Sequence, residues 1–139
     1  YTKDNVICTH NYDREECVQV KNLYDSIINK VEFNYDTIFI DEAQFFSNDL
    51  VSVSKKLARD NKRVLVAGLD TDFRGKPFGP MPALMCESDY LDKLRAICVK
   101  CGNPASFSQR LINDSEQVLI GETDIYEARC RNCFNKEEN

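Results

Sequence analysis

Two adjacent carboxylates follow an apolar run in the segment Ile38-Phe39-Ile40-Asp41-Glu42. A continuous apolar run is typical of a strand buried on both faces of a parallel sheet, and ligands bind at the carboxyl ends of such strands. Successive side chains of a strand point to opposite faces, so Asp41 and Glu42 are expected to have different tasks. The pattern has the form of a Walker B segment, in which one acid helps to hold Mg²⁺ and its neighbour handles the proton of the nucleophile. The alternative is a strand-end turn with two solvated acids.

Four of the seven cysteines form two Cys-x-x-Cys pairs, Cys98 with Cys101 and Cys130 with Cys133. Each pair at a turn presents two thiolates to one metal, and four sulfurs complete the tetrahedral coordination of a structural zinc. The segment between the pairs is longer than in a usual zinc ribbon, and we expect Pro104–Glu122 to loop out. Two redox dithiols, an iron–sulfur cluster and coincidence are the alternatives. Nothing else redox-like accompanies the pairs, which favours structural zinc.

A loop rich in glycine and proline, Asp70–Pro82, carries Phe73 and Phe78 in otherwise polar surroundings. Its composition predicts an ordered loop rather than a helix or strand. Aromatic rings at strand ends can cap a planar ligand, or they can simply anchor the loop on the core. Both interpretations are open from the sequence. The single histidine, His10, is interpreted as a surface residue.

The elements that position these residues alternate between helix and strand. Residues 1–13 are polar and predict a loop. The expected elements after it are helices over 14–31, about 50–60 and 83–91 and strands over 35–41 and 63–70. This order, with short connections, is the βαβ pattern of a parallel sheet flanked by helices, so the fold class is α/β. We expect an α/β domain over residues 1–92 and a zinc-binding domain over residues 93–139.

Size and composition exclude several classes of protein. The 139 residues predict one domain, or one with a small appendage, and a net charge of −5 disfavours broad nucleic-acid binding through phosphates. No apolar run is long enough to span a bilayer, and no signal peptide is visible. An odd cysteine count does not fit a secreted disulfide framework, so the cytosol is the expected compartment. Cys8, Cys17 and Cys86 are interpreted as small, semi-buried residues.

Several segments, in order along essentially all 139 residues, resemble the cytosolic, zinc-containing type of thymidine kinase. They are IDEAQFF, GLDTDFRGKPFGP, SQRL and the two cysteine pairs that flank it. The resemblance implies a P-loop, RecA-like parallel sheet flanked by helices, plus a small C-terminal zinc-ribbon and lasso domain. It implies transfer of the γ-phosphate of ATP to the 5′-hydroxyl of thymidine or deoxyuridine in cytoplasmic nucleoside salvage. A homotetramer and feedback inhibition by dTTP are further implications.

The resemblance also implies roles for individual residues. Glu42 matches the general base that takes the proton of the 5′-hydroxyl, and Asp41 matches the acid that helps to organise Mg²⁺. Phe73 matches the ring that stacks on the base, and Tyr126 matches a tyrosine whose hydroxyl approaches the sugar. Other residues match the lining of the nucleoside site, where Ser108 stands at a position that is often threonine: Phe45, Leu69, Phe78, Ser108, Gln117, Val118 and Leu119.

The segment Asn113–Ile125 matches the family's lasso, a lid that closes over the nucleoside. Main-chain groups around Gln117–Leu119 are expected to bond the edge of the thymine. Arg110 lies in the short segment before this lid, near the acceptor end. The zinc held by the four cysteines would then clamp the two feet of the lid.

One family motif does not occur in the sequence, the phosphate loop G-x-x-x-x-G-K-[ST]. The backbone amides and lysine of that loop bind the β- and γ-phosphates. We therefore expect that the loop precedes Tyr1, that the intact protein is a kinase, and that the 139 residues alone are inactive.

Two other functions are compatible with parts of the sequence. Asp41-Glu42-Ala43-Gln44 also resembles motif II of nucleic-acid helicases, but the chain is acidic and has no arginine-rich motor motif. A zinc module that serves only protein contacts is the other alternative. It would leave the acid pair and the aromatic loop unexplained.

Overall fold

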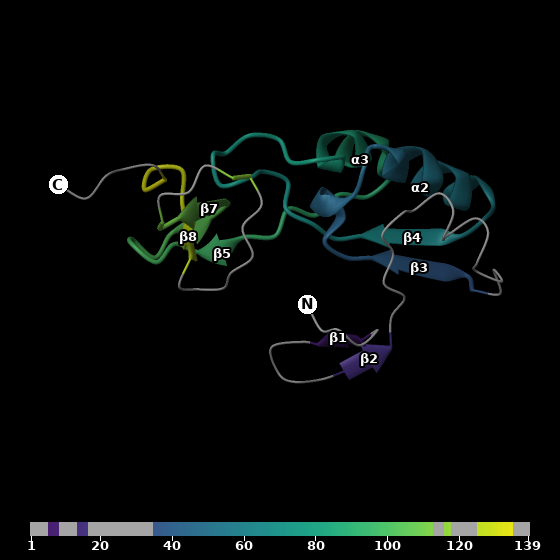
Figure 1. The fold of residues 1–139 in the computed structure, drawn as a ribbon, viewed down its shortest axis with the longest axis horizontal. Helices are drawn as coiled ribbons and strands as arrows, with labels where there is room; N and C mark the ends of the chain where they lie inside the picture. The colour runs from purple at the N-terminus through teal and green to yellow at the C-terminus, as the bar shows by residue number, and fades with distance from the viewer. Residues whose placement is uncertain (1–5, 9–13, 17–34, 113–115, 118–124, 135–139) are drawn as a thin grey trace. The chain divides into compact units, whose positions relative to one another are not determined.

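The computed structural model describes residues 6–8, 14–16, 35–112, 116–117 and 125–134 (Figure 1). The chain divides into two compact units, Tyr1–Asn34 and Tyr35–Asn139. Each is described by itself.

In the first unit, β1 (Val6–Cys8) pairs with the antiparallel strand β2 (Arg14–Glu16). The predictions of a loop before residue 14 and of a helix starting at Arg14 are therefore wrong at these strands. The Val6-Ile7-Cys8 run favours a strand, and a segment rich in turn-forming residues follows it in the sequence. The remainder of the predicted helix, and His10, lie outside the described residues.

The second unit contains a parallel pair of strands joined through a helix. β3 (Thr37–Ile40) and β4 (Arg63–Val66) align with Thr37 opposite Arg63 and Ile40 opposite Val66. The helix α2 (Asp49–Arg59) lies between them in the chain. The predicted βαβ pattern is confirmed, although both strands are shorter than the apolar runs suggested.

Helix α2 packs on the strands through Leu50, Val53 and Leu57, which recur at the three-to-four-residue spacing of one helix face and are all buried. Its C-terminal turn carries the basic residues Lys56 and Arg59, which complement the negative end of the helix dipole. These contacts fix where the carboxyl ends of β3 and β4 lie.

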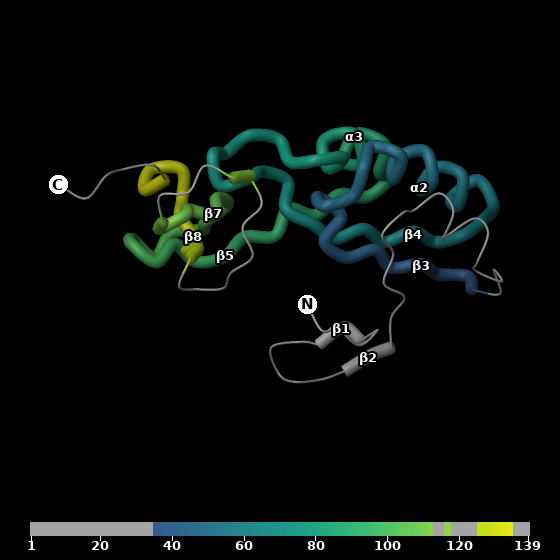
Figure 2. The backbone as a smooth tube through the Cα atoms, in the orientation of Figure 1, coloured from purple at the N-terminus to yellow at the C-terminus, as the bar shows by residue number. Residues whose placement is uncertain are grey.

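The second helix, α3 (Met81–Glu87), lies beside α2 on the same side of the strand pair (Figures 1 and 2). It begins two residues earlier than predicted, because Pro82 occupies the first turn, where a helix needs no amide donor. It ends at Glu87, since Ser88 is extended, so the predicted extension to residue 91 is wrong.

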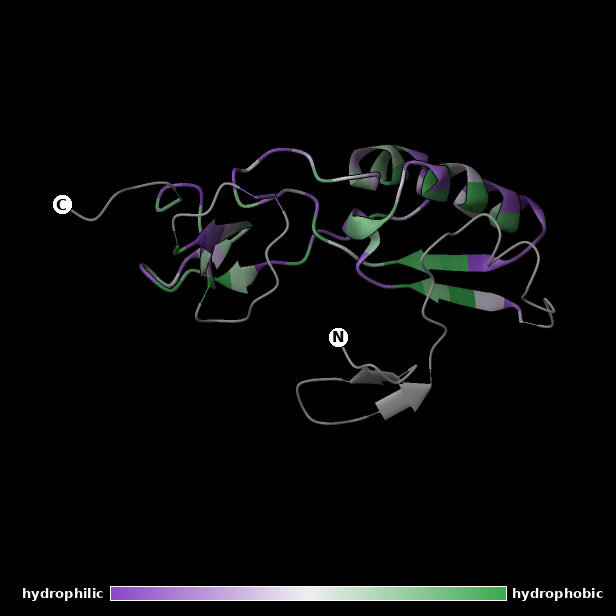
Figure 3. Ribbon diagram, in the orientation of Figure 1, coloured by the Kyte–Doolittle hydropathy of each residue, from purple (hydrophilic) through white to green (hydrophobic). Residues whose placement is uncertain are grey.

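Strand β3 is buried on one face only, contrary to the expectation of a strand buried on both. Ile40 is 8% exposed beneath the helices, whereas Phe39 is 76% exposed. The strands are apolar along most of their length (Figure 3), but the described helices of this unit cover a single side of them. The apolar run of β3 therefore did not show whether one face of the strand is buried or both.

The C-terminal part of the unit consists of short antiparallel strands. β5 (Ala96–Ile97) pairs with β6 (Pro104–Ala105), and β7 (Phe107–Arg110) pairs with β8 (Tyr126–Arg129). Beyond the ladder, the Leu111 amide donates to the Ile125 carbonyl at 2.9 Å. Within the described part of the chain, no helix is long and apolar enough to cross a membrane.

Candidate functional site

The acid pair lies directly after the carboxyl end of β3, where the chain turns into the short 3₁₀ helix η1 (Ala43–Phe45). Both acids are exposed. Glu42 has a left-handed backbone conformation, with φ 53° and ψ 40°, and its amide donates to Asp41 Oδ1 at 2.8 Å. Residues other than glycine rarely adopt this conformation, and those that do gather at functional sites.

The Glu42 carboxylate is bound by Gln44, a residue that the sequence analysis did not single out as part of the site. Gln44 Nε2 donates to Glu42 Oε2 at 2.5 Å, and Gln44 Oε1 accepts from the Leu69 amide at 2.9 Å. The side chain thus links the turn after β3 to the turn after β4. The only feature of the sequence that pointed to Gln44 was its position two residues after Glu42, the candidate general base.

Three of the predicted pocket residues border this turn. The Phe45 and Phe78 rings meet edge to face with centroids 5.7 Å apart, and Leu69 is held through its amide to Gln44. Phe78 is buried, which is the geometry of a loop anchor, whereas Phe45 and Leu69 are partly exposed. An apolar wall therefore lies next to the acid pair.

A second group of predicted residues gathers around Arg110, which is buried at the end of β7. Its guanidinium carbon lies 3.6 Å from the centroid of the Phe73 ring, and Nη2 donates to the Tyr126 hydroxyl at 2.7 Å. The same guanidinium donates to the carbonyls of Glu116 and Gln117, at 2.5 and 3.3 Å. Arg110 therefore joins the aromatic loop, β8 and residues 116–117 of the predicted lasso.

The placement of the remaining lining residues is mixed. Ser108 is half-buried in β7, opposite Ala128 of β8. Val118 and Leu119, with most of the predicted lasso, lie outside the described residues. The contacts of the lasso with a nucleoside therefore stay a prediction.

The loop after β4 is organised by Asp72, a second residue that the sequence analysis did not identify. Its Oδ1 accepts from the amides of Arg74 and Lys76 at 2.9 and 3.0 Å, and its Oδ2 accepts from Gln117 Nε2 at 3.0 Å. Burial of Asp72 opposes ionisation, but these donors and the Arg74 charge outweigh it and lower the pKa of Asp72. The carboxylate thus secures both the aromatic loop and Gln117.

We predict that Asp72→Ala lowers the free energy of unfolding by about 1–3 kcal/mol, because the amides of Arg74 and Lys76 and the side chain of Gln117 lose a buried, charged acceptor. A carboxyl with a lowered pKa stabilises the fold above its ordinary value of 3.8, and this contribution is lost as the pH falls through the folded value. Urea unfolding at pH 7 should therefore separate the wild type from the variant, and the gap should narrow below about pH 4.

The exposed acid Asp89 provides the control for this substitution. Asp89→Ala should unfold like the wild type at both pH values. A midpoint of Asp72→Ala equal to that of the wild type at pH 7 would show that the carboxylate does not hold the loop.

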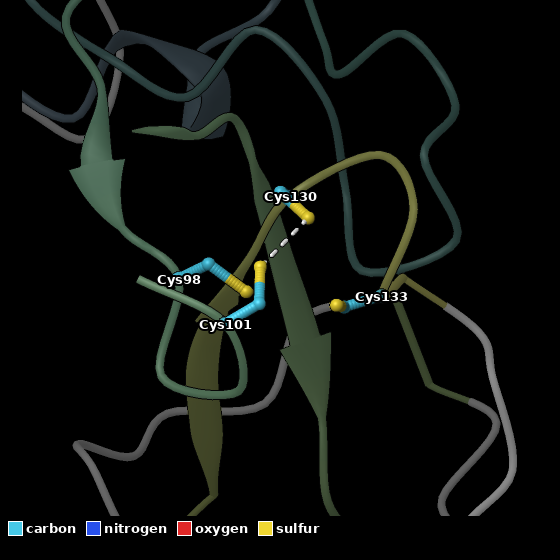
Figure 4. Close-up of side chains that lie close together, drawn as sticks. All are labelled: Cys98, Cys101, Cys130 and Cys133. Carbon is cyan, nitrogen blue, oxygen red and sulfur yellow. Dashed lines mark hydrogen bonds between the residues drawn. The ribbon is translucent and has the colours of Figure 1, made fainter. Parts of the chain in front are cut away.

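The four paired cysteines converge on one space between the β5–β6 turn and the turn after β8 (Figure 4). All four sulfur atoms lie within 4.8 Å of one another, and the sulfurs of Cys101 and Cys130 are 3.5 Å apart. Four sulfurs at about 2.3 Å from one zinc are about 3.8 Å from one another, so the cluster fits this ion. These cysteines are free thiols and could bind zinc.

Backbone donors around the cluster favour thiolates. Burial works against the thiolate of Cys98, but amides of Cys130, Lys100 and Cys101 lower its pKa to about 6. The pKa of Cys133 rises to about 12, because hydrogen bonds with the sulfurs of Cys130 and Cys101 favour its protonated form. A set of thiols that cannot all ionise alone is suited to a divalent cation, which stabilises every thiolate.

Residues 1–134 match the family model described as thymidine kinase. The match extends over both cysteine pairs, the acid pair and the aromatic loop.

Proposed function

Because the chain belongs to the thymidine kinase family, we propose that this enzyme transfers the γ-phosphate of ATP to the 5′-hydroxyl of thymidine, with deoxyuridine as a second acceptor. The observation that carries the proposal is the acid pair at the carboxyl end of β3. Glu42 is exposed in a strained turn, and its carboxylate is held by a buried amide. This is the arrangement of a general base at the mouth of a parallel sheet.

In the proposed reaction, the 5′-oxygen of the nucleoside attacks the γ-phosphorus while Glu42 accepts the proton of that hydroxyl. The bond from that phosphorus to the β–γ bridging oxygen breaks, which releases ADP and leaves thymidine monophosphate. Asp41 supplies a carboxylate oxygen, the type of ligand that Mg²⁺ prefers. Bound Mg²⁺ would neutralise charge on the phosphates.

The acceptor pocket is proposed to lie between the two groups of residues described above. Phe45, Leu69 and Phe78 supply an apolar wall beside the acid pair. On the other side, Phe73 and the residues bound to Arg110 are proposed to contact the base and the sugar. The residues proposed for these contacts are Phe73, Ser108, Gln117, Val118, Leu119 and Tyr126. A flat pyrimidine suits a slot of this composition.

The metal centre is proposed to be structural. Cys98, Cys101, Cys130 and Cys133 fill all four positions of a tetrahedral zinc, so no position is open for a substrate. The ion would fix both ends of the lasso. We further propose a P-loop, RecA-like α/β domain over residues 1–92 and a zinc-ribbon domain over residues 93–139. Family membership supports a cytoplasmic homotetramer and feedback by dTTP as proposals of the same kind.

A phosphorylation assay of the full-length enzyme tests the function. With radiolabelled ATP and Mg²⁺, thymidine and deoxyuridine should be converted to monophosphates, and deoxycytidine should not. ATP hydrolysis that is stimulated by single-stranded DNA, with no nucleoside phosphorylated, would contradict the proposal in favour of a helicase-like function.

A further inference from the structure

We propose that Gln44 is a positioning residue, which holds the Glu42 carboxylate in the orientation needed to take the proton of the acceptor hydroxyl. The inference rests on the proposed role of Glu42 as the general base. It concerns a side chain of η1 that is 2% exposed.

The orientation of the Gln44 amide follows from its partners. The Leu69 backbone amide can only donate, so the amide oxygen of Gln44 must face it, at 2.9 Å. The NH₂ group then faces Glu42 Oε2, at 2.5 Å. An N–H donor therefore meets one defined oxygen of the carboxylate, and the other oxygen is left for the substrate.

Two glycines lie close to Gln44. A Cβ atom at Gly68 would lie 2.7 Å from Gln44 Oε1, and a Cβ atom at Gly79 would lie 2.3 Å from the Gln44 carbonyl oxygen. At distances this short a neighbouring atom would have to shift, so a side chain at either glycine would press on Gln44. The two glycines thus accommodate Gln44 in its observed position.

An exposed glutamate needs such a partner. Its side chain has three rotatable bonds, and in water it samples many rotamers, most of which point away from a bound hydroxyl. A misplacement of about 1 Å in a catalytic group can reduce the rate about 10²-fold. The Gln44 bond removes this freedom before the substrate arrives.

The test is a double-substitution cycle in the full-length enzyme. Gln44→Met retains the approximate side-chain length but has no amide. We expect it to lower kcat by about 10-fold to 10²-fold, with the KM for thymidine and ATP within about threefold of the wild type. In the Glu42→Gln background the same substitution should have little further effect, because there is no base left to position.

A loss of stability must be separated from a loss of positioning. Gln44→Met leaves the Leu69 amide without its acceptor, so its melting temperature is measured beside that of Leu57→Ala, a core substitution in α2. Leu57→Ala should lose comparable stability and keep its kcat in the folded protein.

A second variant tests the same bond without altering either partner. Gly68→Ala places a methyl group against Gln44 Oε1 and Met81 Sδ, and it should displace the amide. Its kcat should fall in the same way as that of Gln44→Met, and again only when Glu42 is present. If Gln44→Met does not fold, Gly68→Ala still tests whether the bond between Gln44 and Glu42 is needed for full kcat.

The outcomes separate the two proposals. An unchanged kcat in Glu42→Gln would overturn the general-base role, and the positioning role with it. A large loss in Glu42→Gln together with full kcat in Gln44→Met and Gly68→Ala would overturn the positioning role alone. Losses that simply multiply in the double variants would show that Gln44 acts through the fold and not through Glu42.

Discussion

Glu42→Gln is expected to reduce the kcat of the full-length enzyme by about 10²-fold or more, while thymidine still binds. Glutamine has the size of glutamate, and its amide oxygen can still accept the hydrogen bond that Gln44 donates. It cannot accept the proton of the 5′-hydroxyl. The substitution therefore removes an interaction made in the transition state and leaves ground-state binding in place.

Two measurements check this expectation together. Steady-state kinetics gives kcat, and titration calorimetry gives the dissociation constant for thymidine, which should change by less than about threefold. Asp60→Asn, an exposed acid at the end of α2, is the matched control and should behave as the wild type. Retention of full kcat by Glu42→Gln would remove this residue from the chemistry.

Cys98→Ser is expected to abolish stoichiometric zinc binding and to unfold the C-terminal part of the second unit. The strands β5 and β6 have two residues each, and the local core consists of the buried residues Cys98, Ala105 and Cys130. A core of this size does not hold a fold without its metal, and structural zinc contributes on the order of 10 kcal/mol in small zinc domains.

The metal content of the purified enzyme should be about one zinc per chain, and Cys98→Ser should contain well below half of that. Because β7 and β8 carry Arg110 and Tyr126, the KM for thymidine should rise at least about tenfold. Cys86 is exposed, contrary to the expectation of a semi-buried residue, and it is not part of the cluster, so Cys86→Ser should keep both its zinc and its KM. A wild-type enzyme with no zinc, or a fully active Cys98→Ser, would contradict the structural role.

Local patterns predicted the parts of this fold in which neighbours along the chain determine the structure. The buried residues of α2 follow a helical period, and the apolar runs on either side of it became β3 and β4. The two cysteine pairs were also recognisable, because metal-ligand spacing is set within each turn. The structure brings their sulfurs together as that spacing predicted.

The errors arose where the structure of one segment depends on its contacts with another segment. Arg14–Glu16 is a strand because it pairs with Val6–Cys8, and no periodicity within the segment shows this. Phe39 is exposed because a face of a strand is buried only where another element packs on it, and the described helices pack on the opposite face of β3. In the candidate site, Gln44 and Asp72 owe their positions to Leu69 and Gln117, which lie 25 and 45 residues away. A motif identifies the acids, but only the folded chain shows what holds them.

The antiparallel pairing of β7 with β8 has an evolutionary consequence. Because the Leu111 amide bonds the Ile125 carbonyl, residues 112–124 begin and end at adjacent points that the ladder and the cysteine cluster already fix. Between ends that are fixed in this way, doubling the number of connecting residues costs only about 0.6 kcal/mol in loop-closure entropy. Insertions between these ends can therefore accumulate at little cost to folding. This hairpin is thus a place where related chains can differ in length while the turn after β3 and the cysteine cluster stay as they are.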